Sequence, residues 1–288
     1  MIEIYDIKDF FETPVKLTTF HINRLADMPK LPATIGSPHQ HTFVEIFVLL
    51  DGSMEHNVDF NQYSVQPSNL FFISQGQYHI WSKASRKTLS GFRLMFEESL
   101  VQNLMLEQNF LFELVYLNNV YQNPLVPICL ENDQRLIQYF ELLHQEYQRH
   151  DCNLKAIQAN LFLLLLEIQR ITYDKETDAG ATYHLSVYQK FSALVNLHFS
   201  QQSSIAWYAS QLNISTAQLN RIVTKFSKLS IGKFLQQRRI LESKRLLATT
   251  TLSVREIAFM IGIEDPSYFI RAFKKSENTT PQEFRSKM

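Results

Sequence analysis

Three histidines and one glutamate have the types and spacing of metal ligands. His39, His41 and Glu45 occur in SPHQHTFVEIFVLLDG, and His79 follows in SQGQYHIW. If the first stretch is extended, alternation places His39, His41 and Glu45 on one face of a strand. Three imidazoles and one carboxylate suit iron, manganese or zinc. Alternatively, these residues are hydrogen-bonded side chains or polar contacts to an organic ligand, and no metal binds.

The segments that must position these residues have the pattern of strands. Residues 15–96 contain short β-branched and aromatic runs, such as KLTTFHI, FVEIFVLL, LFFI and FRLMF, separated by turn-forming residues. Residues from about 98 to 173 contain long segments without Gly or Pro, which predict helices. One segment carries an apolar stripe that either covers the strands or faces a partner: Leu161, Leu164, Leu165 and Ile168.

Aromatic residues and one arginine accompany the histidines. An apolar pocket for a small molecule would be lined by Phe43, Phe47, Tyr78 and Trp81. Arg93, in the candidate strand SGFRLMF, could pair with a carboxylate of that molecule. The alternative for Arg93 is an ordinary surface arginine.

Base recognition in DNA is a second chemistry, indicated by VREIAFMIGIEDPSYFIRAFKKSEN near the C-terminus. Gly262 suits the left-handed residue that ends a helix. Asp265 can cap the next helix, and Pro266 suits its first position. That second helix would bury Phe269, Ala272 and Phe273, and would expose a stripe at helical spacing: Ser267, Ile270, Arg271 and Lys274.

The same pattern occurs earlier, in IAWYASQLNISTAQLNRIVTKFSKLSIGKFL, at an offset of 49 residues that becomes 50 after the turn. Ser215 is the equivalent cap, and the outward stripe is Ala217, Asn220, Arg221 and Thr224. Arg bonds guanine and Asn bonds adenine in the major groove. Lysines suited to phosphate contacts are Lys225, Lys228, Lys274 and Lys275.

The segment between the two copies, residues 230–250, predicts a helical spacer. Its apolar face would consist of Phe234, Leu235, Leu241 and Leu246. A stiff spacer would let both outward helices enter successive major grooves, about 34 Å apart.

Charge is divided unevenly along the chain. Residues 183–288 hold 15 Lys and Arg but 6 Asp and Glu, whereas the whole chain has a net charge of +0. A basic part joined to an acidic part indicates that one part meets a polyanion. The cysteines, Cys129 and Cys152, have no metal-type spacing, and no signal peptide or membrane-length apolar run is visible. We therefore expect a cytoplasmic protein that does not enter membranes.

Residues 187–288 resemble the DNA-binding domain of the AraC/XylS family of bacterial transcription regulators. The resemblance is carried by SVREIAFMIGIEDPSYFIRAFKKSENTTPQEFR. The N-terminal half is similar to the cupin-type sensor domain of that family, through H-x-H-x3-E-x6-G and an approximate P-x-G-x2-H in which Ser74 replaces Pro. The family resemblance implies base contacts by Ala217, Asn220, Arg221, Ser267, Ile270 and Arg271.

The resemblance implies an α+β multidomain fold. A cupin-like β-barrel (about 15–96) with flanking helices (about 98–173) would occupy residues 1–175, a linker residues 176–186, and an all-α domain with two helix-turn-helix units residues 187–288. The barrel would enclose a small effector without a metal or other cofactor. The candidate effector-binding residues are His39, His41, Phe43, Glu45, Phe47, His79, Trp81 and Arg93. The flanking helices would support a homodimer.

The predicted function is transcription regulation without enzymatic activity. The chain would be an activator that responds to a small effector, for which an aromatic acid is one candidate, and it would contact promoter DNA and RNA polymerase. One alternative is a metal-dependent dioxygenase or isomerase joined to a DNA-binding module. Another is a constitutive repressor whose barrel is only structural. Metal analysis of the purified protein separates the first alternative from the rest.

Overall fold

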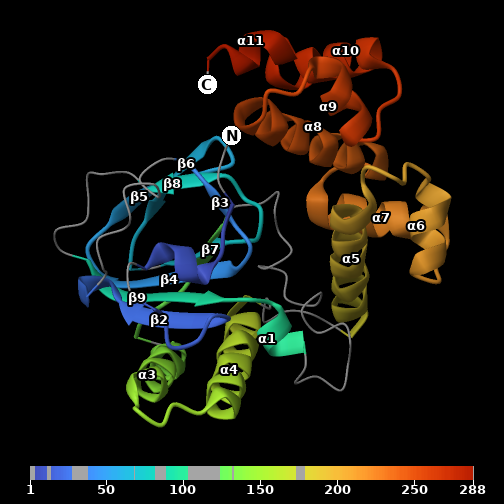
Figure 1. The fold of residues 1–288 in the computed structure, drawn as a ribbon. Coiled ribbons are helices and arrows are strands. Elements are labelled where there is room, and N and C mark those ends of the chain that lie inside the picture. Colours follow the sequence, from blue (N-terminus) through green and yellow to red (C-terminus); the bar gives the residue numbers. More distant parts are fainter. Residues whose placement is uncertain are drawn as a thin grey trace. The chain divides into compact units, whose positions relative to one another are not determined.

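The computed structural model describes residues 4–11, 14–27, 38–67, 69–81, 89–102, 124–131, 133–172 and 179–287. The chain divides into two compact units, Glu3–Glu176 and Thr177–Met288, whose elements are drawn in Figure 1. No helix among the described residues combines the length and the apolar character needed to cross a bilayer.

Strands dominate the first unit, Glu3–Glu176, and we call strands β1–β9 the barrel. The largest sheet has the order β10-β7-β4-β9-β2, a second has the order β6-β5-β8, and β1 pairs with β3. A bridge between His39 and His79 connects the two smaller sheets. The strands are β1 (Ile4–Tyr5), β2 (Phe20–Arg24), β3 (Gln40–His41), β4 (Val44–Asp51), β5 (Met54–Val58), β6 (Asn61–Val65), β7 (Asn69–Ile73), β8 (His79–Trp81), β9 (Ser90–Phe96) and β10 (Leu125–Pro127).

Strand β4 lies in the middle of the largest sheet and separates two apolar cores. Its alternate residues Val44, Ile46 and Val48 pack with helices α3 (Gln134–Gln148) and α4 (Leu154–Thr172), whereas Phe47 and Leu49 pack inside the barrel. In Figure 1 these two helices cover the outer face of the sheet. This alternation explains why both faces of β4 are apolar. The inward face is also the one that carries Glu45.

The apolar stripe of α4 covers the sheet. Leu161, Leu164, Leu165 and Ile168 are each 0% exposed and belong to the same core as Val44. Of the two interpretations of this stripe, the cover of the strands is therefore correct. The exposed leucines of α3 and α4 are different residues: Leu142, Leu154 and Leu163.

Residues 98–186 were expected to form helices followed by a linker, and the structure differs from this expectation in two places. Strand β10 lies where only helices were expected, because three residues are too short to show alternation, and Pro127 suits an edge strand. Of the first expected helix the described residues include only α1 (Ser99–Gln102). The expected linker, residues 176–186, overlaps α5, which begins at Ala179 and contains no proline, while residues 176–178 lie outside the described residues.

The second unit, Thr177–Met288, is helical throughout its described residues. Pairs α6/α7 and α9/α10 are the two predicted helix-turn-helix units, and α8 lies between them. The helices are α5 (Ala179–His198), α6 (Ile205–Gln211), α7 (Thr216–Ser227), α8 (Ile231–Thr249), α9 (Val254–Met260), α10 (Pro266–Glu277) and α11 (Pro281–Arg285). Together with the strand-rich first unit, these helices confirm the α+β fold.

The spacer α8 is a helix, as predicted, but its buried face is broader than expected. Leu241 and Leu246 are half-buried, whereas Ile240 and Leu247 are buried. Helix α8 packs against four other helices, α5, α7, α9 and α11. A helix with neighbours on several sides has no single apolar stripe.

The turns of the two units use different residues for the same left-handed conformation. Gly262 has φ +74°, and a Cβ built there would lie 2.0 Å from the carbonyl oxygen of Ser200. Asn213 takes the equivalent place with φ 54°. Glycine and asparagine are the residues that tolerate this region best. The prediction for Gly262 is confirmed.

Candidate functional sites

Helix α10 begins at a well-defined cap and presents a polar outer face. The side chain of Asp265 accepts a hydrogen bond of 2.8 Å from the backbone N–H of Ser267, and Pro266 occupies the first turn. Phe269 and Phe273 are 0% exposed and hold the inner face in the core. The outer face is exposed as predicted, at Ser267, Ile270, Arg271, Lys274 and Lys275.

Helix α7 repeats this construction with a neutral cap. The hydroxyl of Ser215 accepts a hydrogen bond of 3.1 Å from the N–H of Gln218. Leu219 and Val223 are buried, and the half-buried Phe226 stacks on Tyr188 with a centroid distance of 5.3 Å. The exposed side chains are Ala217, Asn220, Arg221, Thr224 and Lys225.

Two of the predicted DNA-binding residues in α7, Asn220 and Thr224, already have partners inside the unit. The Asn220 side-chain oxygen accepts a weak hydrogen bond of 3.4 Å from the N–H of Ile231, at the start of α8. The Thr224 hydroxyl donates to the carbonyl of Leu229 at 3.3 Å. A bidentate contact from Asn220 to adenine would require it to give up its bond to Ile231. Arg221 has no ion pair among the described residues.

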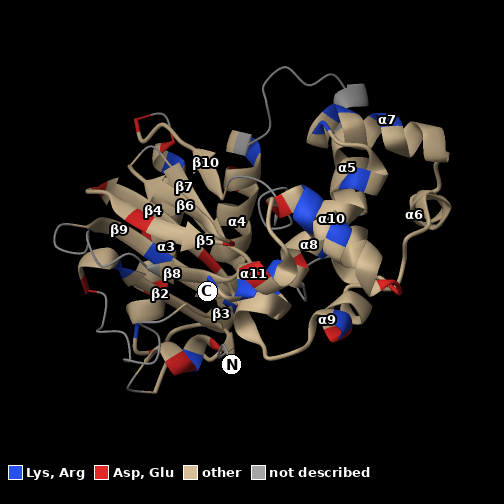
Figure 2. Cartoon of the chain, turned by 90° about the horizontal axis from the view of Figure 1, so that it is seen from above, with Lys and Arg blue, Asp and Glu red and all other residues tan. Residues whose placement is uncertain are grey.

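Basic residues of the second unit serve two purposes. Figure 2 shows Lys and Arg on α5, α8 and α10. Arg238 and Arg245 of α8 are buried and pair with Glu242 at 2.7 and 3.4 Å. Part of the positive charge is therefore neutralised internally, and the exposed part includes Arg271 and the lysines of α10.

The barrel interior brings the predicted histidines and glutamate together. His39, His41 and His79 are each 1% exposed, and Glu45 is 0% exposed. The ring of His79 lies 4.3 Å from that of His39 and 4.7 Å from that of His41. The candidate ligand atoms of His41, Glu45 and His79 all lie within 4.8 Å of one another. The sequence spacing therefore identified a real cluster, although His41 lies on β3 and Glu45 on β4 rather than on one strand.

Arg93 joins this cluster from strand β9, so the surface interpretation of this arginine is wrong. It is 0% exposed, and its Nε atom forms an ion pair with the Glu45 carboxylate. The guanidinium lies 5.0 Å from the ring centroid of Phe10 and 5.9 Å from that of Phe47. Neither Nη atom has a hydrogen-bond partner among the described residues.

Electrostatics within the barrel favour a charged Glu45 and neutral imidazoles at His56 and His79. Burial acts to raise the pKa of Glu45, but the charge of Arg93 and the contact with His41 lower it to about 2. Burial lowers the pKa of His56 to about 3, and burial together with the neighbouring histidines lowers the pKa of His79 well below its usual value. At neutral pH the arginine and glutamate neutralise each other.

The cluster contains ligand atoms suited to a metal ion, but it also contains the cationic Arg93, which opposes metal binding. The Nδ1 atom of His79 lies 3.0 Å from the carbonyl of Gln77, which leaves Nε2 as its ligand atom. Neutral imidazoles and a carboxylate are suitable ligands for zinc or iron. The guanidinium of Arg93 already occupies one Glu45 oxygen, however, and its positive charge would repel a divalent cation.

The remaining predicted pocket residues do not all join the cluster. Phe43 and Phe47 are buried, and Phe43 stacks on His41 at a centroid distance of 4.0 Å. Tyr78 instead lines a separate surface pocket of about 410 Å³ with Phe60 and Asn57. The side chain of Trp81 lies outside the described residues.

Sequence reasoning missed two residues beside the cluster. His56 is 0% exposed, and its ring lies 5.4 Å from that of His79. Phe10, on the short helix η1 (Ile7–Phe10), packs edge-on against His39 at 5.5 Å. The alternation of Met54, His56 and Val58 could have revealed His56 as an inward residue. Phe10 precedes the expected barrel and carries no such signal.

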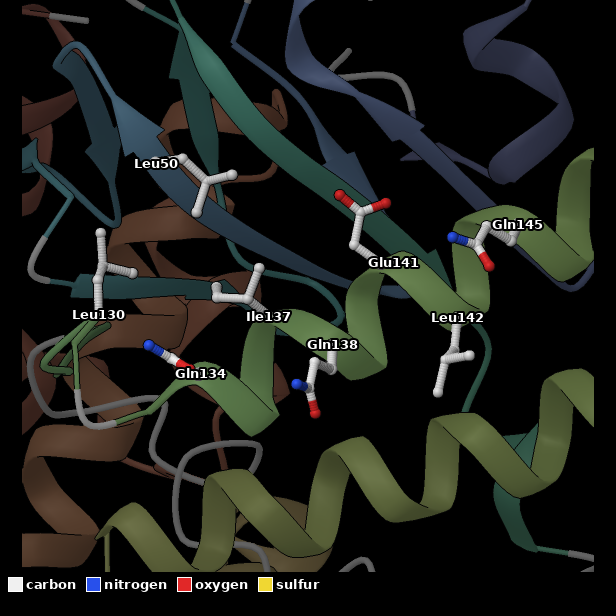
Figure 3. Close-up of a pocket in the computed structure, with 8 residues that line it drawn as sticks. All are labelled: Leu50, Leu130, Gln134, Ile137, Gln138, Glu141, Leu142 and Gln145. Carbon is white, nitrogen blue, oxygen red and sulfur yellow. The ribbon is translucent and has the colours of Figure 1, made fainter.

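A second hollow lies on the outer side of the first unit. It is an open groove of about 600 Å³ between the end of β4 and helix α3, and Figure 3 shows its lining side chains. Apolar and amide groups dominate the lining, which consists of Leu50, Leu130, Gln134, Ile137, Gln138, Glu141, Leu142 and Gln145. None of the predicted effector residues belongs to it.

Comparisons with known proteins identify both parts of the chain. A helix-turn-helix domain model matches residues 208–287, and an AraC-like ligand binding domain model matches residues 32–165. The transcriptional activator RhaR of Mannheimia succiniciproducens is 22% identical over 86% of this chain and 87% of its own length. The activator RhaS of Salmonella schwarzengrund is 24% identical over 89% of this chain and 90% of its own.

Solved structures include similar proteins as well. Unsaturated fatty acid bound ToxT from Vibrio cholerae is 16% identical, with a TM-score of 0.40, over 95% of this chain and 97% of that one. The C-terminal domain of the response regulator yesN from Fusobacterium nucleatum is 30% identical, with a TM-score of 0.32, over 33% of this chain and 93% of that one.

A β-rich ligand-binding unit together with paired helix-turn-helix units defines a DNA-binding transcription regulator. The chain belongs to the AraC family of such regulators.

Proposed function

We propose that this chain is a non-enzymatic transcription activator, which binds promoter DNA through α7 and α10 and responds to a small molecule held in the barrel. The observation that carries the proposal is the matched construction of the two helices. Each is capped at its N-terminus, buries an apolar face and exposes an arginine at the equivalent position, Arg221 or Arg271. Helices of this kind fit the major groove.

The proposed roles within these helices follow from their chemistry. Arg221 and Arg271 would bond guanine edges, with Asn220, Ala217, Ser267 and Ile270 close to other bases. Lys225, Lys274 and Lys275 would contact phosphates, and Thr224 would lie beside them. Ile270 is 38% exposed and Ala217 is also exposed, so both can meet a thymine methyl group.

We propose a small organic acid as the effector, and an aromatic acid as one candidate. The unpartnered Nη atoms of Arg93 support an anion, because a buried guanidinium fork suits a carboxylate. Phe10, Phe43 and Phe47 beside the cluster support an apolar or aromatic body for that ligand. His39, His41, Glu45 and His79 would supply the remaining polar contacts.

The relatives are named as transcriptional activators, which supports activation by this chain. We propose that activation includes a contact with RNA polymerase. We also propose a cytoplasmic homodimer. The exposed leucines of α3 and α4 support a partner face: Leu142, Leu154 and Leu163. A dimer would carry four reading helices and so bind a longer site. Sedimentation equilibrium of the full chain tests the dimer, and a monomer across the micromolar range contradicts it.

DNA binding is tested with the full chain and a pool of duplexes that have a randomised centre. Wild type should select a repeated site. Arg271→Ala should lose about 1–3 kcal/mol of discrimination at one base position. Lys274→Ala should weaken all sequences alike and lower the slope of the salt dependence by about 1. If wild type selects no sequence, the proposed function is wrong.

Effector binding is tested by thermal unfolding with benzoate and with benzamide, a neutral analogue of similar shape. An acid at 100 times its Kd should stabilise the chain by about 2.7 kcal/mol. Arg93→Lys is the matched variant, because it keeps the charge but loses the planar fork. We expect benzoate but not benzamide to raise Tm, and Arg93→Lys to abolish that rise. Equal effects of both compounds would exclude recognition of the carboxylate.

The cluster of His41, Glu45 and His79 supports a second candidate function, a metal-dependent oxygenase or isomerase joined to the DNA-binding unit. Elemental analysis of the purified chain distinguishes the two. Stoichiometric iron, manganese or zinc that is lost in His41→Ala, together with loss of regulation, would favour the enzyme. A metal-free chain that still regulates its promoter would favour the activator.

A further inference from the structure

The cap of α10 touches the arginine that we propose as a base reader. One oxygen of Asp265 caps the helix, accepting a hydrogen bond from the Ser267 N–H at 2.8 Å. The other oxygen lies 3.7 Å from an Nη atom of Arg271. The side chains of Arg271 and Asp265 are 70% and 60% exposed, so this ion pair lies at the reading surface. The Asp265 carboxylate thus both caps α10 and contacts Arg271, the proposed base-reading arginine.

The first helix-turn-helix unit provides an internal comparison. Ser215 takes the place of Asp265 and caps α7 with a hydroxyl. Arg221 takes the place of Arg271 and has no ion pair within the described residues. Both helices are capped, so capping does not require a charge. Of the two caps, Asp265 of the second helix-turn-helix unit carries a charge, and Ser215 of the first does not.

A fixed negative charge beside a reading arginine has two physical effects. It restrains a long, flexible side chain, which lowers the entropy lost when the guanidinium binds a base. It also holds the two guanidinium donors in one orientation, which matches the paired acceptors N7 and O6 of guanine, whereas adenine and thymine each present a single acceptor, N7 or O4. The second effect reduces binding to incorrect sequences more than to the correct one, which is a gain in specificity.

We propose that Asp265 is a specificity-determining residue, which positions Arg271 for guanine and penalises other bases at that position. This inference rests on the proposed DNA-reading function and adds a residue to it. The carboxylate should leave overall affinity unchanged or slightly reduce it, because it brings negative charge toward DNA. It should sharpen selection at the base that Arg271 reads. The first unit, with Ser215, should discriminate less sharply at its equivalent base.

Asp265→Asn is the informative variant, because asparagine caps a helix as well as aspartate but carries no charge. An exposed ion pair contributes little to folding, so Tm should stay within a few degrees of wild type. Asp265→Ala would remove both the cap and the charge and cannot separate them. The reciprocal variant is Ser215→Asp, which keeps the cap of α7 and adds a carboxylate near Arg221.

The experiment measures competition binding of the full chain to its selected duplex and to every single-base variant of it. Arg271→Ala first identifies the position that Arg271 reads. Asp265→Asn should then lower discrimination at that position roughly fivefold and leave other positions unchanged. The double variant Asp265→Asn/Arg271→Ala should match Arg271→Ala alone, and Ser215→Asp should sharpen the position that Arg221 reads.

Each other outcome has a separate meaning. If Asp265→Asn discriminates like wild type, Asp265 is only a cap and the inference is wrong, although DNA reading stands. If discrimination falls equally at all positions, the effect is general electrostatics or helix fraying, which also overturns it. If wild type itself selects no sequence, or Arg271→Ala changes no position, the proposed reading by Arg271 is wrong and the inference falls with it.

Discussion

The two units of the chain place their key charges in opposite environments. In the first unit, Arg93 and Glu45 are both 0% exposed and neutralise each other among aromatic rings. In the second unit, the side chain of Arg271 is 70% exposed on the outer face of α10. A charge buried in a low-dielectric interior is coupled to folding, whereas a charge at the surface is available for a partner. The same substitution should therefore act on stability in one unit and on DNA binding in the other.

The largest expected effect is that of Arg93→Ala. Removing one partner of a buried pair leaves Glu45 charged and unpaired, which should cost about 3–5 kcal/mol of the free energy of unfolding. Arg271→Ala should stay within about 0.5 kcal/mol of wild type, because surface changes rarely do more. Urea unfolding monitored by hydrogen exchange reports the two units separately.

A double variant sharpens this contrast. Arg93→Met with Glu45→Gln removes both charges and keeps similar volumes, so it should recover much of the stability that Arg93→Ala loses. If Arg93→Ala and Arg271→Ala change stability equally, the two charges are not in different environments, and the comparison between the units fails.

The next largest effect concerns the turn of the second unit. Gly262→Ala places a Cβ atom 2.0 Å from the carbonyl oxygen of Ser200 at φ +74°. We expect a loss of about 2–4 kcal/mol, from the left-handed backbone and from the steric contact. Asn213→Gly, at the equivalent position of the first unit, is the control and should be close to neutral. Thermal unfolding of the two variants measures the difference, and equal Tm values would contradict it.

Local patterns predicted the features that depend on neighbours along the chain. The caps at Ser215 and Asp265, the left-handed Gly262 and the exposed faces of α7 and α10 follow from spacings of a few residues. The alternation along β4 likewise placed Glu45 and Phe47 on one face. Such features are readable from one sequence because helical and strand periods are fixed by backbone geometry.

Features that depend on distant contacts were missed or mistaken. Arg93 was a candidate contact for an effector carboxylate, with a surface arginine as the alternative. Its pairing with Glu45 was not foreseen, because an arginine is seldom fully buried and Glu45 is 48 positions away. The broad buried face of α8 arises from helices on several sides, which periodicity along α8 alone does not show. Strand β10 is only three residues long and gains its hydrogen bonds from β7. These outcomes were set by tertiary packing.

Acid should destabilise the first unit more than the second. Burial lowers the pKa of His56 to about 3, so the unfolded chain binds the proton more readily than the folded one. Neutral His56 makes its full contribution to the free energy of unfolding above about pH 6.5. That contribution falls as the pH drops from 6.5 toward 3, by up to about 1.4 kcal/mol per pH unit.

His56→Gln tests this pH effect, because glutamine is polar but does not titrate. Between pH 6.5 and 5 the wild-type first unit should lose about 2 kcal/mol from this group, and the variant should show a flatter profile. Hydrogen exchange at each pH measures both units in one sample. A profile for His56→Gln that parallels wild type would show that His56 is not the acid-sensitive group.

The smallest expected effect concerns the hydroxyl cap of α7 in the second unit. Ser215→Ala removes the hydroxyl that accepts the bond from Gln218 and should destabilise α7 by about 1 kcal/mol. Ser215→Asn restores an acceptor and should recover most of that loss. Because α7 carries Arg221, fraying of its first turn should also weaken DNA binding at every base position, unlike the loss at one position expected for Arg271→Ala. Helical content by circular dichroism, measured beside DNA affinity, links the two effects. A normal affinity in a chain whose α7 has lost its cap would mean that the first turn of α7 does not meet DNA, and that reading by the first unit begins further along the helix.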